Sequence, residues 1–175
     1  MGTVLNWLLK FRQRWKRLAL EALLLIGIFA GIQLFQARDL PEGQAPPLEG
    51  VLTDGSSAKV GEAGTAQLVV FWATWCPVCK AEEGNIESVA ADWPVISVAM
   101  QSGNAAEVRK HLQERGLKLP ALVDEDGRHA SNWKVRGVPT HFVVDAAGNI
   151  RFRVVGYATT WGLKLRLWWA AKFPQ

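Results

Sequence analysis

The stretch from Val70 to Glu82 reads Val-Phe-Trp-Ala-Thr-Trp-Cys-Pro-Val-Cys-Lys-Ala-Glu and contains both cysteines of the chain, Cys76 and Cys79. The apolar run over 67–72 suits a strand buried on both faces. From Cys79 onward, the apolar residues have the spacing of an amphipathic helix. The cysteines therefore lie where a buried strand gives way to a helix. Unpaired N–H groups and the helix dipole at such a position favour a thiolate over a thiol.

The order of the two cysteines predicts their roles. Cys76 comes first and is expected to be the attacking sulfur, since the thiolate is the reactive form. Pro77 suits the first helical position, where its missing N–H removes no hydrogen bond. Cys79 follows three residues later on the same helical face and can close a disulfide onto Cys76.

Three other interpretations of the pair have to be weighed. Buried core cysteines would lie on an apolar stripe, whereas this pair begins a helix in a turn. A zinc site needs four ligands, and the sequence has no second Cys-x-x-Cys and no His-x-His. An inert structural disulfide between residues three apart would constrain little of the unfolded chain. In an oxidising compartment, the redox-active interpretation is favoured.

Helix and strand signals alternate along the rest of the chain. They predict a helix over 79–93, a strand over 95–100, a helix over 105–115, a short strand over 119–123, a helical turn over 130–134 and a hairpin of strands 140–145 and 150–155. This order predicts an α/β protein, a mixed central sheet with helices on both faces. A last helix is expected to pack one face on the sheet, with contact to a membrane surface as the alternative; that face comprises Trp161, Leu165, Trp168 and Trp169.

The N-terminal segment has the composition of a membrane anchor. Segment 1–17 carries five basic residues and no acid, and segment 18–35 is apolar apart from Glu21 and Gln33. A helix of that length reaches roughly 27 Å, close to a hydrocarbon core of about 30 Å. A cleavable signal peptide is the competing interpretation, but no small-x-small cleavage site follows Phe35.

The charge bias orients this anchor. It places segment 1–17 in the cytoplasm and the following domain outside, which in a bacterium is the periplasm. The Pro- and Gly-rich segment 36–47 is expected to be a linker, and 48–175 the soluble domain of a single-pass inner-membrane protein. Residues 36–175 hold 15 basic and 15 acidic side chains, so the formal charge of +4 belongs to the N-terminus. This balance argues against a nucleic-acid partner.

Two motifs carry a resemblance to a known family. The stretch Val70–Glu82, the later Arg136-Gly-Val-Pro-Thr140 and the order of elements between them resemble a thioredoxin-fold protein. The anchor, and the extra helix and strand between residues 101 and 124, are similar to the TlpA-like branch, which includes cytochrome c maturation thioredoxins and proteins of copper tolerance. The resemblance covers about residues 45 to 170. It implies a membrane-anchored protein disulfide oxidoreductase that needs no cofactor.

The resemblance also implies roles for residues outside the cysteine pair. Val138 and Pro139 would form a cis peptide in the loop facing the dithiol, and the backbone of Val138 would pair with an extended segment of a partner protein. Trp75, Pro77 and Thr140 would line the same shallow groove. From the residues alone, an ordinary turn before a strand is the alternative for Pro139.

Glu82 is the third candidate catalytic residue. In similar proteins, an acid at this position helps to move a proton to or from the buried second cysteine, here Cys79. From the residues alone, Glu82 and Glu83 are equally well interpreted as exposed acids favoured in the first turns of a helix. Ordinary thioredoxins place a buried acid six residues before the first cysteine. This chain has Val70 there, which leaves Glu82 as the nearest candidate.

The expected activity is dithiol-disulfide exchange with partner proteins. Cys76 would attack a partner disulfide, and Cys79 would release the reduced partner. The reducing or isomerising direction is expected because no histidine lies between the cysteines, and a membrane electron-donor protein would recharge the pair. The alternatives are apocytochrome c thiol reduction, which differs only in the partner, and a copper-binding metallochaperone that uses Cys76, Cys79 and His141.

No other metal or cofactor site is predicted. His111, His129 and His141 are scattered, and each is expected to be a surface or partly packed histidine. The run Asp124-Glu-Asp-Gly127 has charges that suit calcium but lacks the rest of an EF-hand loop, so a turn is expected.

Overall fold

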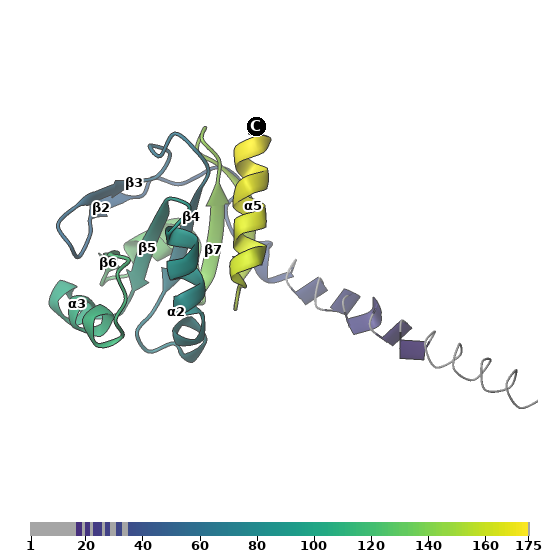
Figure 1. Cartoon of the computed structure of the whole chain (residues 1–175), viewed down its shortest axis with the longest axis horizontal. Helices are drawn as coiled ribbons and strands as arrows, with labels where there is room; N and C mark the ends of the chain where they lie inside the picture. The colour runs from purple at the N-terminus through teal and green to yellow at the C-terminus, as the bar shows by residue number, and fades with distance from the viewer. Residues whose placement is uncertain are drawn as a thin grey trace, which may run out of the picture. The chain divides into compact units, whose positions relative to one another are not determined.

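Figure 1 shows the computed structural model of the chain, which describes residues 17–18, 20–21, 23–25, 27–28, 31–32 and 35–174. The chain divides into two compact units, Met1–Arg38 and Asp39–Gln175. Over the described residues alone, no helix combines the length and the apolar character needed to cross a membrane. The predicted basic segment 1–17 lies outside the described residues except for Arg17, and so does part of the predicted span 18–35.

The second unit is built on a six-stranded sheet of order β1-β8-β7-β4-β5-β6. The central strand β4 pairs in parallel with β5, and β5 pairs in parallel with β6. On the other side β7, β8 and β1 follow in antiparallel pairs. The strands are β1 (Gly43–Gln44), β4 (Gln67–Trp72), β5 (Val95–Met100), β6 (Ala121–Asp124), β7 (Thr140–Val144) and β8 (Asn149–Val155). The predicted α/β class with a mixed central sheet is confirmed.

Helices cover both faces of this sheet. One face carries α2 (Pro77–Ala90), α3 (Ala105–Glu114) and α5 (Thr160–Lys172); in Figure 1 α2 lies in front of the strands, with α3 and α5 to either side of it. The short helix α4 (Arg128–Asn132) leads into Trp133, whose ring packs against Phe71 and Phe142 on the opposite face. All six residues of β4 are buried as a result. This explains why the strand is a continuous apolar run rather than an alternating one.

The dithiol helix begins and ends earlier than the sequence predicts. α2 begins at Pro77 because Cys76 is its N-cap and a proline fits the first helical position. It ends at Ala90 instead of residue 93, since the residue before Pro94 is sterically kept from the helical conformation. The elements that hold the two cysteines are therefore fixed by local sequence.

Part of the segment predicted to be a linker pairs with the sheet. Gly43 and Gln44 form β1 against Ile150 and Asn149 of β8. A separate hairpin follows, made of β2 (Glu49–Val51) and β3 (Ser57–Lys59). Leu48, just before it, is 2% exposed. The chain therefore joins the folded unit before the short hairpin begins.

The prediction for the last helix is wrong in its orientation. α5 packs on the core through Leu163, Leu167 and Ala170, which are fully buried. Apolar residues occur on two opposite faces of α5, so periodicity cannot tell which face is inside. The aliphatic face fits against the sheet, and the face predicted to pack is turned outward, with exposed fractions of 82, 64, 50 and 46% for Trp161, Leu165, Trp168 and Trp169.

Candidate active site

Cys76 occupies the N-cap of α2, at the junction between β4 and the helix. Its backbone is extended, and its sulfur accepts a hydrogen bond from the backbone N–H of Cys79 at 3.3 Å. The thiol donates to the carbonyl oxygen of Val138, with 3.4 Å between sulfur and oxygen. One of the free N–H groups of the helix is therefore directed at this sulfur, an arrangement that suits a thiolate nucleophile.

Cys79 lies on the inner side of the helix. Both cysteines are free thiols in this structure, and Cys79 is packed with Trp72, Ala73 and Ala99. Burial raises the pKa of the Cys79 thiol above its ordinary value, and the hydrogen bond with Cys76 and the charge of Glu82 act in the same direction. Cys79 is therefore a protonated thiol at neutral pH. It needs a base before it can attack a mixed disulfide.

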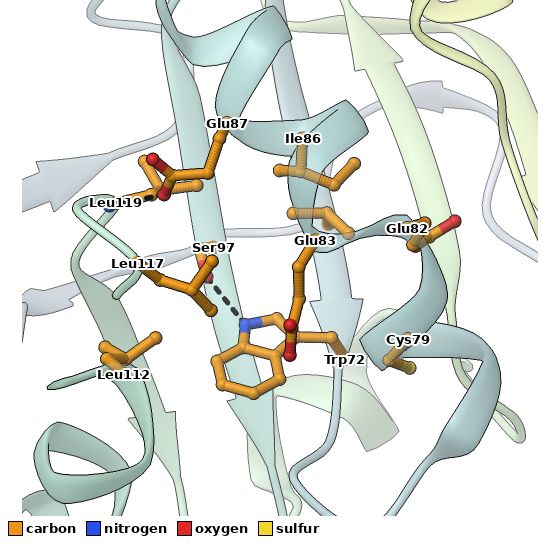
Figure 2. A pocket seen from close by; sticks show the side chains of 11 residues that line it. Trp72, Cys79, Glu82, Glu83, Ile86, Glu87, Ser97, Leu112, Leu117 and Leu119 are labelled. Atoms are coloured by element: carbon orange, nitrogen blue, oxygen red, sulfur yellow. Dashed lines mark hydrogen bonds between the residues drawn. The ribbon is translucent and has the colours of Figure 1, made fainter. Parts of the chain in front are cut away.

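A small cavity lies beside Cys79, under α2 and against β4, β5 and α3 (Figure 2). Its volume of about 40 Å³ is enough for water. Cys79 and Glu82 both line it, and across it the indole N–H of Trp72 donates to the hydroxyl of Ser97 at 2.6 Å. Water in this cavity would have access to the second sulfur and to a carboxyl group.

Glu82 is buried, with 1% of its surface exposed, which rules out the alternative of an exposed acid. Its Oε2 accepts the backbone N–H of Ala158 at 3.0 Å. Its Oε1 lies 3.0 Å from Nε2 of His141, a residue of β7 that is itself fully buried. The expectation of a surface or partly packed His141 is wrong, because the inward side of β7 places its ring against α2.

The hydrogen bonds of this pair require a shared proton. Nδ1 of His141 lies 3.4 Å from the carbonyl oxygen of Val154, which can only accept, so Nδ1 carries a hydrogen. Between Nε2 and Glu82, either an imidazolium donates to a carboxylate or a carboxyl group donates to a neutral imidazole. In both cases the pair has no net charge, which lowers the free-energy cost of burying it. A buried proton carrier therefore lies one helical turn from Cys79.

The same contacts bear on the copper-binding alternative. That alternative requires His141 to bind a metal together with Cys76 and Cys79. Both ring nitrogens of His141 are instead engaged, one with Glu82 and one with Val154. In the part of the chain that the structure describes, no three His, Cys, Asp or Glu side chains are grouped as a metal site would need.

The loop before β7 closes the site from the other side. The peptide bond between Val138 and Pro139 is cis, as the resemblance implies. Val138 is half-buried and contacts the Cys76 thiol through its carbonyl group, whereas Pro139 is buried. Thr140 is buried too, and its hydroxyl donates to the carbonyl of Gly137 at 2.8 Å. The Thr140 side chain therefore supports the loop from inside, below the surface that a partner would touch.

The surface next to the dithiol is open. Trp75 is 58% exposed, and its indole N–H donates to the carbonyl of Gln101 at 3.1 Å. Pro77 is exposed beside it. An open pocket of about 430 Å³ adjoins Trp75 and is lined by polar side chains, among them Gln101, Ser102 and Lys110. A partner chain that reaches Cys76 would meet this mixed aromatic and polar surface.

Residues 36–162 match the Redoxin family. The chain belongs to the Redoxin family. It is 35% identical over 107 residues to the "Thioredoxin-like protein" of Haemophilus influenzae, covering 61% of this chain and 64% of that protein. It is 32% identical over 150 residues to the "Thiol:disulfide interchange protein DsbE homolog" of Paracoccus denitrificans, covering 77% of this chain and 83% of that protein.

A solved structure agrees with these relatives. The thiol:disulfide interchange protein of Chlorobium tepidum has 25% sequence identity and a TM-score of 0.64, and the match covers 76% of this chain and 99% of that chain. Together, the comparisons confirm the resemblance to TlpA-like thioredoxins. The Redoxin-family match includes both cysteines, the Val138–Pro139 loop and His141.

Proposed function

We propose that this Redoxin-family protein is a thiol-disulfide oxidoreductase acting on partner proteins through Cys76 and Cys79. The observation that carries the proposal is the cysteine pair at the N-terminus of α2, with Cys76 at the N-cap and Cys79 on the inner side of the helix; both are buried. The names of relatives such as the Paracoccus denitrificans protein support the same activity.

In the proposed reaction, two electrons pass from the dithiol to a partner disulfide. The Cys76 thiolate attacks one sulfur of the partner, the partner S–S bond breaks, and the departing thiolate takes up a proton. Cys79 then loses its proton and attacks the sulfur of Cys76. This second step breaks the mixed disulfide, releases the partner as a dithiol and leaves a Cys76–Cys79 disulfide.

We propose that Glu82 accepts the proton that Cys79 loses in the second step. The raised pKa of Cys79 means that the thiol does not ionise readily near neutral pH. Glu82 lines the same cavity, and when His141 holds the proton that the two residues share, the carboxylate of Glu82 can accept the proton of Cys79. His141 acts here as a positioning residue that fixes the carboxyl group of Glu82 through the hydrogen bond to its Oε1.

Glu82→Gln is expected to slow the release of the partner by about 10²-fold near neutral pH, because an amide cannot accept the proton of Cys79. The rate should then rise about tenfold per pH unit, since the thiolate fraction below a raised pKa grows in that proportion. Quenched-flow measurement of mixed-disulfide decay against pH tests both effects. His141→Gln should shift the same profile by a smaller factor.

Glu83→Gln is the matched control for this experiment. It makes the same chemical change one residue along the helix. Glu83 lines the same cavity, but its carboxylate is paired with Arg115, the C-cap of α3, at 2.7 Å. We expect its pH profile to follow that of the wild type. An unchanged profile in the Glu82→Gln variant would remove Glu82 from the mechanism and leave the exchange reaction itself intact.

The proposed setting is the periplasmic side of a bacterial inner membrane, with the apolar segment 18–35 as a single-pass tether. The support is in the sequence: a basic segment 1–17, then an apolar stretch of spanning length. A tethered reductase would be recharged by a membrane electron-donor protein. Apocytochrome c and a partner in copper tolerance are the two candidate substrate classes that the resemblance offers.

The reducing or isomerising direction predicts a low reduction potential. Pro77 and Val78 lie between the cysteines, so no histidine is there to stabilise the reduced form as a thiolate. We expect a potential nearer to about −270 mV, the value of thioredoxin, than to about −120 mV, the value of a strong oxidant. Equilibration with a thiol buffer followed by alkylation and mass spectrometry measures it. A value near the oxidant's would reverse the proposed direction.

A further inference from the structure

The outward face of α5 is an apolar stripe without a partner in the described chain. Its members recur at the spacing of one helix face, and Tyr157, before the helix begins, is also exposed. In Figure 1 this helix lies along the edge of the folded unit. Contiguous exposed apolar surface of this kind marks an interaction site in a soluble domain. The stripe comprises Trp161, Leu165, Trp168, Trp169 and Phe173.

Positive charge accompanies the stripe. From Tyr157 to the end of the chain there are three basic residues and no acid. At 3.6 residues per turn, Lys164 and Arg166 fall on opposite sides of the stripe, and Lys172 lies at its C-terminal end. Asp92, in the turn after α2, pairs with Lys164 at 2.5 Å, so the charge there is partly balanced. The net charge of the surface remains positive.

We propose that the outer face of α5 binds the surface of an anionic lipid bilayer. Tryptophan and tyrosine favour the boundary between headgroups and acyl chains, and basic residues beside them attract anionic lipids. The opposite face of the helix, with Leu163 and Leu167, is buried in the domain. The helix would therefore lie in the plane of the interface while remaining part of the fold.

Charge complementarity and composition favour lipid over another occupant. A second copy of this chain would bring its own Lys164, Arg166 and Lys172 against the same set, and like charges would repel. An anionic bilayer complements all three. The chain also has an apolar segment 18–35 of spanning length, so a bilayer is the surface that the sequence itself brings near. The inference goes beyond the proposed function, because it does not depend on the dithiol.

Lipid quenching tests the proposal. The full chain is reconstituted into vesicles with and without about 30% anionic lipid, in each case with brominated acyl chains that quench nearby tryptophans. The quenching due to α5 is the quenching of the wild type minus that of the triple variant Trp161→Phe/Trp168→Phe/Trp169→Phe. This variant keeps an aromatic side chain at each position. We expect this difference to show strong quenching in anionic vesicles. The binding that it reports should weaken about five-fold for the charge removed by Arg166→Gln or Lys172→Gln, and less for Lys164→Gln because Asp92 already pairs with that residue.

Two controls distinguish lipid contact of α5 from quenching of other tryptophans and from contact that does not depend on charge. Trp75→Phe removes an exposed tryptophan of the active-site surface and should leave the α5 contribution unchanged. At about 1 M salt, where the Debye length is about 3 Å, the α5 contribution should fall. No quenching of the α5 tryptophans in anionic vesicles would overturn the proposal. Shielding of the same tryptophans that depends on protein concentration, without lipid, would also overturn it and identify a second copy as the occupant.

Discussion

Cys76→Ser is expected to reduce disulfide exchange to the uncatalysed background, a loss of about 10³-fold or more. The reason is chemical, because serine cannot form the mixed disulfide through which exchange proceeds. Reduction of a model protein disulfide, followed by the appearance of free thiols, measures the loss. Substantial exchange in this variant would place the reactive sulfur elsewhere and contradict the mechanism.

The structure indicates that the Cys76→Ser variant loses its activity without unfolding. Cys76 is the N-cap of α2 and accepts the N–H of Cys79. Serine is among the preferred N-cap residues, so its hydroxyl can accept the same hydrogen bond. We therefore expect the Cys76→Ser protein to unfold at a temperature close to that of the reduced wild type. A large fall in that temperature would mean that the variant reports on folding and not on catalysis.

Cys79→Ala is expected to have the opposite outcome and to accumulate the mixed disulfide. Cys76 still attacks the partner, but no second thiol can release it, so the covalent complex should persist on the hours scale of uncatalysed disulfide reshuffling. Non-reducing electrophoresis shows the complex, and mass spectrometry identifies the attached protein. A haem-binding Cys-x-x-Cys-His partner would indicate apocytochrome c reduction.

The double variant Cys76→Ser/Cys79→Ala is the control for the trap. It keeps the surface formed by Trp75, Pro77 and the Val138–Pro139 loop but has no sulfur to bind a partner. No protein should remain attached to it. Equal amounts of attached protein in the single and double variants would show that the complex is not formed through Cys76, and the proposed order of attack would be wrong.

Local sequence was sufficient for the elements that carry the dithiol. The apolar run over 67–72 and the proline after Cys76 each determine the structure of the neighbouring residues only. The positions of β4 and of the start of α2 therefore follow from the sequence pattern. The cis peptide at Val138 followed only from the resemblance, because the residues alone favour an ordinary turn.

The buried pair of Glu82 and His141 could not be predicted in this way. The two residues are 59 positions apart and meet only when β7 packs under α2. A signal was nevertheless present, since His141 is the one ionisable residue of β7, and buried polar groups need partners. The prediction of which face of α5 is buried was wrong for a different reason. Both of its faces are apolar, so the fit against the sheet decides which one is buried.

The different positions of the two cysteines impose an order on catalysis. Both are buried, but Cys76 is the N-cap beside the exposed Trp75, whereas the raised pKa of Cys79 keeps that thiol protonated, so electrons enter and leave through Cys76. The protein that recharges the dithiol and the protein that it reduces must then compete for one docking surface and visit it in turn. The proposed oxidoreductase would therefore show ping-pong kinetics, and an excess of either protein would inhibit turnover of the other.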